Sequence, residues 1–113
     1  MASISNEELL NKLKTLASSN FPKFQKQLPL EEQVYVLKTN EGLSVVIRFS
    51  RDSISIQEGE YTNPISTLTT SSFELNQMLT GQLDPVKAFL GGKIKIQGDV
   101  FKTMALNNLL KGG

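Results

Sequence analysis

The residue types that usually carry protein chemistry are scarce in this chain. It contains no His and no Cys, so it lacks the common proton shuttle, the thiolate nucleophile and the usual zinc ligands. Paired glutamates, which could do general acid and base work, occur at positions 7–8, 31–32 and 58–60. Each pair lies in an expected capping turn or loop, where carboxylates are commonly solvated. We therefore expect that the protein is not an enzyme and that it has no catalytic residue, no metal site and no cofactor.

The glycine-rich segments also lack the spacing of phosphate-binding loops. The sequence has neither Gly-x-Gly-x-x-Gly nor Gly-x-x-x-x-Gly-Lys-Ser/Thr, and Gly91, Gly92 and Lys93 precede an expected strand rather than a helix. The C-terminal Leu-Lys-Gly-Gly is similar to the tail of ubiquitin-like modifiers, but it directly follows an expected helix. We interpret both glycine pairs as helix ends.

The composition is typical of a globular protein. The 113 residues are 39% hydrophobic and carry 12 basic and 11 acidic side chains, so the charge balance gives no indication of nucleic-acid binding. No apolar run approaches the roughly 18 residues that a membrane span needs, and the first residues lack the order of a signal peptide. We expect a single domain over residues 1–113, located in the cytoplasm.

The first half of the chain predicts one helix followed by three strands. Ser5 and Glu8 have capping-box spacing, and apolar residues then recur at helical intervals over residues 9–17. Two prolines indicate a connector over residues 20–32, with one short helical turn around Phe24. Clusters and alternations of strand formers predict a hairpin over residues 33–50 and a third strand over residues 53–57.

The second half predicts two strands and three helices. Residues 65–70 are rich in β-branched side chains, and residues 93–97 alternate between Ile and Lys. Helices are expected over residues 73–79, between Asp84 and Gly91, and over residues 100–110. The last helix carries more apolar side chains than one core-facing stripe requires, which predicts an apolar contact on its second side.

Large apolar side chains gather in the last third of the chain. Periodicity alone favours a packed core for them, and the alternative is that short helices on a sheet leave a cavity for an apolar ligand. The ten candidates are Phe73, Met78, Leu79, Leu83, Phe89, Ile94, Ile96, Phe101, Met104 and Leu109.

A family resemblance in the last forty residues favours the cavity. The sequence resembles the signature of the sterol carrier protein 2 domain family, in which a Gly-x-Leu-x-Pro helix leads to a Gly-Lys-Leu-Lys-Ile-x-Gly-Asn strand and a closing amphipathic helix. The residues that carry the resemblance are Gly81, Leu83, Pro85, Ala88, Phe89, Gly92, Lys93, Ile94, Lys95, Ile96, Gly98 and Asp99. The resemblance implies an α+β fold whose five-stranded, mostly antiparallel sheet is covered by helices. It also implies an apolar tunnel, which the ten candidate side chains would line.

The resemblance implies that the protein binds a lipid ligand and, by extension, transfers it. The ligand would be a fatty acid, an acyl-CoA or a sterol-like lipid, and transient contact with a membrane is among the expected interactions. The alternative is an accessory domain that presents a hydrophobic biosynthetic intermediate, such as a quinone precursor, to an enzyme partner. A third hypothesis, a protein-interaction domain with a filled core, also stays open. Phe101 stands where family members often carry a small residue, and Asn107 where they often carry Gln.

Overall fold

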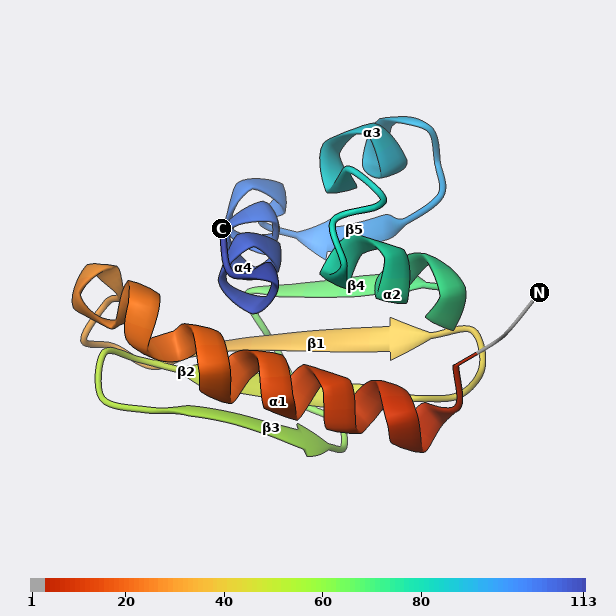
Figure 1. Ribbon diagram of the computed structural model, residues 1–113. Helices are drawn as coiled ribbons and strands as arrows, with labels where there is room; N and C mark the ends of the chain where they lie inside the picture. Colours follow the sequence, from red (N-terminus) through yellow and green to blue (C-terminus); the bar gives the residue numbers. More distant parts are fainter. Residues whose placement is uncertain (1–3) are drawn as a thin grey trace.

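The computed structural model describes residues 4–113, which form a five-stranded mixed sheet in the order β3-β2-β1-β4-β5 (Figure 1). The strands β1 (Gln33–Thr39), β2 (Ser44–Phe49) and β3 (Ile54–Glu58) make an antiparallel meander. The strand β4 (Ser66–Thr70) runs parallel to β1, and β5 (Lys95–Gly98) pairs antiparallel with β4. The expected α+β fold with a mostly antiparallel sheet is confirmed.

The helix α1 (Asn6–Phe24) lies along the meander, over β3 (Figure 1). It begins at the predicted capping box, in which Glu8 N donates to Ser5 Oγ and Ser5 N donates to Glu8 Oε1, each at 3.1 Å. Its buried side chains Leu9, Leu13 and Ala17 are spaced by four residues and so share one face of the helix, which packs into the core.

The prediction of a connector from residue 20 is wrong for its first part. The helix continues through Pro22 to Phe24, and the short 3-10 helix η1 (Gln25–Gln27) follows. A proline inside a helix costs about 3 kcal/mol, because it lacks an N–H and crowds the preceding turn. Tertiary contacts hold the segment nevertheless: Asn20 Nδ2 donates to the carbonyl oxygen of Leu110 at 2.8 Å, and Phe24 packs against the core.

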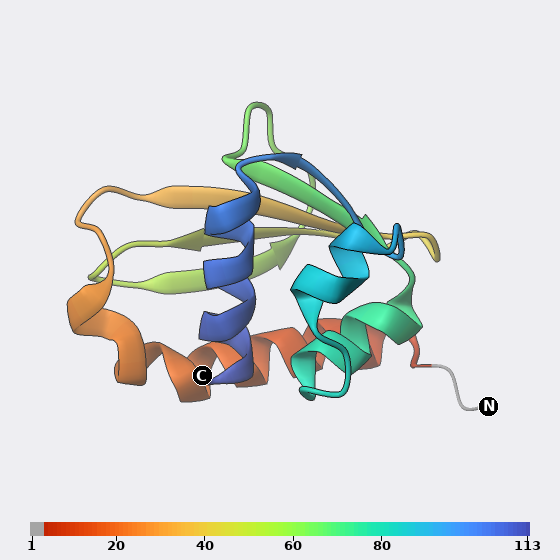
Figure 2. The same cartoon turned by 90° about the horizontal axis from the view of Figure 1, so that it is seen from above.

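The helices α2 (Ser72–Leu79), α3 (Pro85–Leu90) and α4 (Val100–Lys111) cover the same face of the sheet as α1 (Figure 2). Each begins at a residue whose side chain accepts a hydrogen bond from the first turn of the helix, namely Ser71, Asp84 and Asp99. Gly112 ends α4 in a left-handed conformation, with φ of 96°, and its amide donates to the carbonyl of Asn108. The C-terminal glycines thus close a helix, as interpreted. Among residues 4–113, none of the helices is long and apolar enough to cross a membrane.

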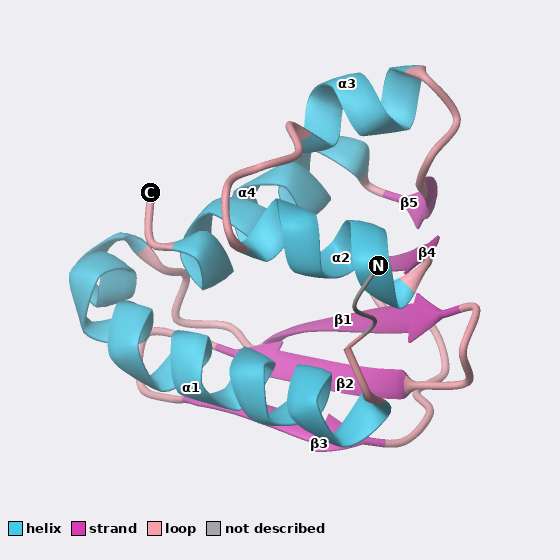
Figure 3. Ribbon diagram, turned by 45° about the vertical axis from the view of Figure 1, so that its right-hand side comes forward, coloured by secondary structure: helices cyan, strands magenta, loops and turns pink. Residues whose placement is uncertain are grey.

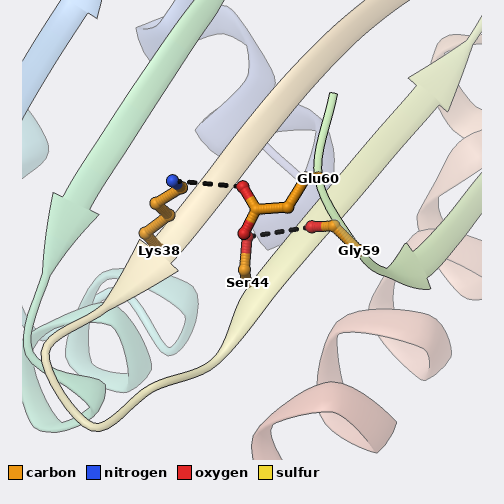
Figure 4. Close-up of polar contacts among 4 residues, drawn as sticks. All are labelled: Lys38, Ser44, Gly59 and Glu60. Carbon is orange, nitrogen blue, oxygen red and sulfur yellow. Dashed lines mark hydrogen bonds and ion pairs between the residues drawn. The ribbon is translucent and has the colours of Figure 1, made fainter. Parts of the chain in front are cut away.

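The opposite face of the sheet is crossed by the connection between β3 and β4, residues 59–65. Ser44 Oγ donates to the carbonyl oxygen of Gly59 at 2.9 Å, and the Lys38 Nζ to Glu60 Oε1 distance is 3.2 Å (Figure 4). Further along, the Arg48 guanidinium lies 4.8 Å from the ring centroid of Tyr61. These contacts hold the connection between β3 and β4 against the outer face of the sheet.

Candidate functional site

An apolar cavity lies between the sheet and the helices α2 and α4. Its volume of about 20 Å³ exceeds the roughly 10–15 Å³ that one water molecule needs and is far below the roughly 300 Å³ of small ligand pockets. The expected tunnel is therefore not open in this structure. The lining residues are Leu37 and Leu68 from the sheet, Leu75, Met78 and Leu79 from α2, and Thr103, Leu106, Asn107 and Leu110 from α4.

The first turn of α4 is fixed to the sheet by local geometry. A Cβ atom at Gly98 would lie 2.3 Å from the carbonyl oxygen of Ile65, and Gly98 has a φ of +110°, so this position requires glycine. Thr103 Oγ1 donates to the carbonyl oxygen of Asp99 at 2.7 Å and lies 2.5 Å from Ser66 Oγ. Since the threonine proton goes to Asp99, Ser66 supplies the proton of the second bond. The helix α4 forms the roof of the cavity, and near its start it is thus hydrogen-bonded to β4.

Asn107 brings a polar group into this apolar site. Its Nδ2 atom is buried, and it has no hydrogen-bond partner among the described residues. The other polar side chain in the lining, Thr103, has its hydroxyl fully paired. Leaving a buried N–H unpaired costs about 1–3 kcal/mol, so its presence here is a departure from ordinary core packing. The amide is available to an acceptor atom that enters the cavity.

A surface groove lies on each side of α4. The η1 groove, of about 190 Å³, is bordered by Leu28 and Pro29 on one side and by Ala105, Leu106 and Leu109 of α4 on the other. The α3 groove, of about 260 Å³, runs between the start of α3 and the outer side of α4, and Leu83, Pro85, Val86, Met104, Asn108 and Lys111 line it. Leu106 lines both the cavity and the η1 groove. This side chain therefore borders both the interior cavity and a groove on the surface.

Five of the ten candidate side chains lie at these spaces. Met78 and Leu79 line the cavity, Leu83 and Met104 line the α3 groove, and Leu109 lines the η1 groove. They surround α4 from three sides rather than forming one continuous wall. In the closed structure the candidate set is thus divided between the interior and the surface.

The other five candidates lie outside the cavity and the two grooves. Ile94 is buried in the core, and Phe89 and Ile96 are partly buried against it. Phe73 and Phe101 are exposed, at 41% and 87%. The expected apolar contact on the second side of α4 is therefore made by Leu109, beside Phe24 and Leu28, and not by Phe101.

Sequence reasoning missed most of the lining that the structure assembles. Leu37 and Leu68 were expected only as strand residues, and Leu75, Leu106 and Leu110 were not singled out at all. Positions 103, 106, 107 and 110 share one face of a helix, and this spacing was the available signal. It shows which residues face the same way but not that α2 and the sheet leave a gap opposite them.

The polar groups around the site include the phenol of Tyr35. Tyr35, which borders the η1 groove, donates to Gln33 Oε1 at 3.0 Å, and its burial, with a smaller effect of Asp99, raises its pKa to about 12. The phenol therefore keeps its proton at neutral pH. Within residues 4–113, no three His, Cys, Asp or Glu side chains lie close enough together to hold a metal ion. The cavity itself offers hydrocarbon, one hydroxyl and one amide.

Solved structures with the same fold come from several kinds of protein. The fold is similar to that of "UbiJ-SCP2 Ubiquinone synthesis protein", with a TM-score of 0.68 and 13% identity over 87% of this chain and 84% of that one. It is also similar to sterol carrier protein domain 2 of Helicoverpa armigera, with a TM-score of 0.65 and 21% identity over 100% and 97%. The sec-alkylsulfatase Pisa1 from Pseudomonas sp. matches 75% of this chain at 15% identity with a TM-score of 0.67, but the match spans only 14% of the sulfatase.

The sequence itself matches a family model over nearly its whole length. A comparison with curated protein sequences gave no significant match. The model of the SCP-2 sterol transfer family, in contrast, matches residues 10–111. That range contains the sheet, the helices α2, α3 and α4, and the cavity between them. The chain therefore belongs to the SCP-2 sterol transfer family.

Proposed function

We propose that the protein binds a lipid beneath α4 and transfers it, with a fatty acid, an acyl-CoA or a sterol-like lipid as the ligand class. The observation that carries this proposal is the position of Leu106, which stands between the apolar cavity and the η1 groove. A shift of this side chain and of the middle of α4 would join the two spaces into an apolar channel. The expected tunnel is, in this proposal, the opened state of the site.

The attachment of α4 supports such an opening. Near its start the helix is hydrogen-bonded to β4 through Thr103 and Ser66, and at its end the Leu110 carbonyl accepts from Asn20. Between these points, the side chains of Leu106 and Asn107 make no hydrogen bond to another element within the described residues. Side-chain packing alone holds the middle of the roof, and packing against a cavity is weaker than packing in a filled core.

The energetics allow an apolar site without a charged anchor. Burial of a 16-carbon chain contributes about 0.8 kcal/mol per methylene, or roughly 12 kcal/mol before the costs of association and of opening the site. Micromolar affinity corresponds to about 8 kcal/mol. The difference leaves roughly 4 kcal/mol for those costs, so a modest rearrangement of α4 is compatible with useful affinity.

A reversible crosslink between α4 and β4 tests the proposal. The chain contains no cysteine, and Ser66 Oγ and Thr103 Oγ1 are 2.5 Å apart, so the double variant Ser66→Cys/Thr103→Cys places one disulfide across the roof of the cavity. We expect the wild-type protein to bind a fluorescent 16-carbon fatty acid with micromolar affinity. The crosslink fixes only the start of α4, which stays attached to β4 in the proposed opening, so the oxidised and reduced forms of the double variant should bind the fatty acid with equal affinity.

The reduced form of the same variant is the matched control, because it has the same sequence and lacks only the crosslink. Circular dichroism of both forms checks that the fold is kept. A loss of affinity on oxidation would show that the start of α4 must separate from β4, and would contradict an opening at Leu106. Failure of the wild type to bind any long-chain fatty acid, acyl-CoA or sterol probe would overturn the proposed function itself.

A second candidate function is to present a hydrophobic biosynthetic intermediate to an enzyme partner. The similarity to a structure described as a ubiquinone synthesis protein favours it, because that protein has the same fold over most of both chains. Mass spectrometry of lipids extracted from the freshly purified protein separates the two functions: fatty acids or sterols support transfer, and a quinone precursor supports presentation.

We propose no catalytic role in either case, because neither the Thr103 hydroxyl nor the Asn107 amide is an acid or base at neutral pH. The cytoplasmic location expected from the sequence is part of this proposal.

A further inference from the structure

The side-chain amide of Asn107 differs from that of the other buried asparagine. Among residues 4–113, Asn107 Nδ2 is the one buried side-chain nitrogen or oxygen atom that lacks a hydrogen-bond partner. Asn20 has the usual arrangement, because its Nδ2 donates to the carbonyl oxygen of Leu110 at 2.8 Å. Buried polar groups of folded proteins are generally paired, and each exception requires an explanation. Asn20 joins two helices, whereas Asn107 presents a donor to the cavity.

The surroundings of Asn107 explain why its amide has no partner in the closed structure. The helices α2 and α4 lie side by side above β1 and β4, and Asn107 lines the cavity that they enclose (Figure 3). Seven of the nine lining residues are Leu or Met, whose side chains offer no strong acceptor. The remaining one, Thr103, is already bonded to Ser66 and to the carbonyl of Asp99. A partner for Asn107 Nδ2 must therefore come from a ligand.

The chemistry of the cavity indicates which ligand atom fits. None of the described lining residues carries a positive charge, so a carboxylate or phosphate beneath α4 would be buried without a counterion. Such burial is strongly unfavourable, whereas a neutral hydroxyl or carbonyl oxygen needs only a hydrogen-bond donor. Lys102 lines the η1 groove, where a charged end of the ligand can stay in contact with water. The cavity is thus suited to a neutral oxygen and the groove to a charge.

We infer that Asn107 selects lipids that carry a hydroxyl or carbonyl oxygen in the part that lies beneath α4, by donating its Nδ2 proton to that oxygen. The inference rests on the proposed function and narrows its ligand class. An unsubstituted acyl chain fills the cavity with hydrocarbon and leaves the amide unpaired. An oxygen-bearing chain or ring pairs it, so Asn107 is a specificity-determining residue. The same oxygen would be rejected by a purely apolar site, because it would lose its hydrogen bonds to water without replacement.

A set of matched 16-carbon acids tests this inference. The probes are hexadecanoic acid, its derivatives with a hydroxyl on carbon 10 or carbon 16, and its derivative with a carbonyl on carbon 10. Displacement of the fluorescent fatty acid measures the affinity of each. We expect the wild type to bind at least one hydroxy acid and the carbonyl derivative about threefold or more tighter than hexadecanoic acid. In Asn107→Leu, every oxygenated acid should bind at least tenfold more weakly than hexadecanoic acid.

A control variant makes the same change away from the site. Asn11→Leu replaces an exposed asparagine on α1, and it should keep the affinity ratios of the wild type. Equal ratios in the wild type and in Asn107→Leu would overturn the inference. So would a preference for hydroxyl over both carbonyl and hydrocarbon, because the amide would then accept a proton rather than donate one. Failure of the wild type to bind any of the four acids would overturn the proposed function as well, so the two failures are distinguishable.

Nuclear magnetic resonance of the wild type gives a second measurement that does not depend on how a variant folds. The side-chain amide signals of asparagine are observed in nitrogen-15-labelled protein, and those of Asn107 should move most when the tightest oxygenated acid is added. Hexadecanoic acid should move them less, because it brings no oxygen to the amide. The amide signals of Asn20, which already has a partner, should be the same with both ligands. Equal shifts of the Asn107 signals with both ligands would contradict the proposed hydrogen bond.

Discussion

The two ends of the sheet are packed in different ways. Over β1, β2 and β3, the long helix α1 buries Leu9 and Leu13 against Val45 and Ile47, and all four side chains are 0% exposed. Over β4 and β5, three short helices enclose a cavity, border two grooves and leave Leu90 and Phe101 exposed. We call these the packed region and the open region. The comparison indicates that the first holds the fold together, whereas the second contains the spaces in which we propose that a ligand binds.

Truncation of core leucines should give the largest difference between the two regions. Leu13→Ala should reduce the free energy of unfolding by about 2–5 kcal/mol, because the rigid meander cannot collapse around the new cavity. Leu106→Ala should reduce the free energy of unfolding by less, about 2 kcal/mol, because the middle of α4 can move toward the sheet. Urea denaturation monitored by circular dichroism measures both values. Equal losses would contradict the distinction between a packed and an open region.

Asn107, whose amide nitrogen is buried, and the buried Asn20 give the next largest contrast. Asn107→Leu should increase the free energy of unfolding by about 1–2 kcal/mol, because it removes an unpaired buried N–H from the cavity. Asn20→Leu should decrease it by about 1–3 kcal/mol, because Asn20 Nδ2 donates to the Leu110 carbonyl. Thermal and urea unfolding measure both changes. A destabilised Asn107→Leu variant would show that the amide is already satisfied in the closed site.

Tyr35 provides a pH-dependent test of the packed region. Because burial raises its pKa from 10.0 to about 12, the folded state keeps the phenol proton more tightly than the unfolded state does. The stabilisation is fully present below pH 10 and is lost as the pH rises toward 12. Between pH 10 and pH 11 this loss is about 1 kcal/mol. The difference in unfolding free energy between wild type and Tyr35→Phe should therefore change by that amount, and a constant difference would argue against burial of the phenol.

The smallest expected effect concerns a contact that joins the two regions. Glu41, in the turn between β1 and β2, accepts from Ser72 N at 2.8 Å and from Ser72 Oγ at 2.9 Å, at the start of α2. These bonds lower the pKa of Glu41, so the carboxylate stabilises the fold above its ordinary pKa of 4.5 and stops doing so as the pH falls through its lowered value. Acid titration of stability should be slightly less steep in Glu41→Gln. An identical acid profile would show that the contact adds nothing.

Most of the fold could be predicted because its signals are local. The capping residues Ser5, Asp84 and Asp99 and the terminal Gly112 mark helix ends through their own conformations and hydrogen bonds, so a short stretch of sequence suffices. The continuation of α1 through Pro22 could not be found in this way. It depends on contacts with Leu110, ninety residues later, which outweigh the local preference of proline.

The candidate site could be predicted less well because it depends on helix phase and on gaps between elements. Phe101 and Leu106 are both large apolar residues of α4, yet Phe101 is 87% exposed and Leu106 lines the interior cavity. Helical spacing assigns each to a face, but only the placement of α2 and β4 decides which face is covered. The unpaired amide of Asn107 is likewise a property of its surroundings and has no sequence signal.

The parallel pairing of β1 with β4 has a consequence for the order of folding. Tyr35 lies beside Ser66 in the register, thirty-one positions apart, whereas β1, β2 and β3 are joined by short turns. Closing the longer loop costs more chain entropy before any contact is made, so pairing between strands that are close in sequence is kinetically favoured. The meander can therefore assemble before β4 docks beside it. The part of the chain that we propose as the lipid site is, on this argument, the last to acquire its native structure.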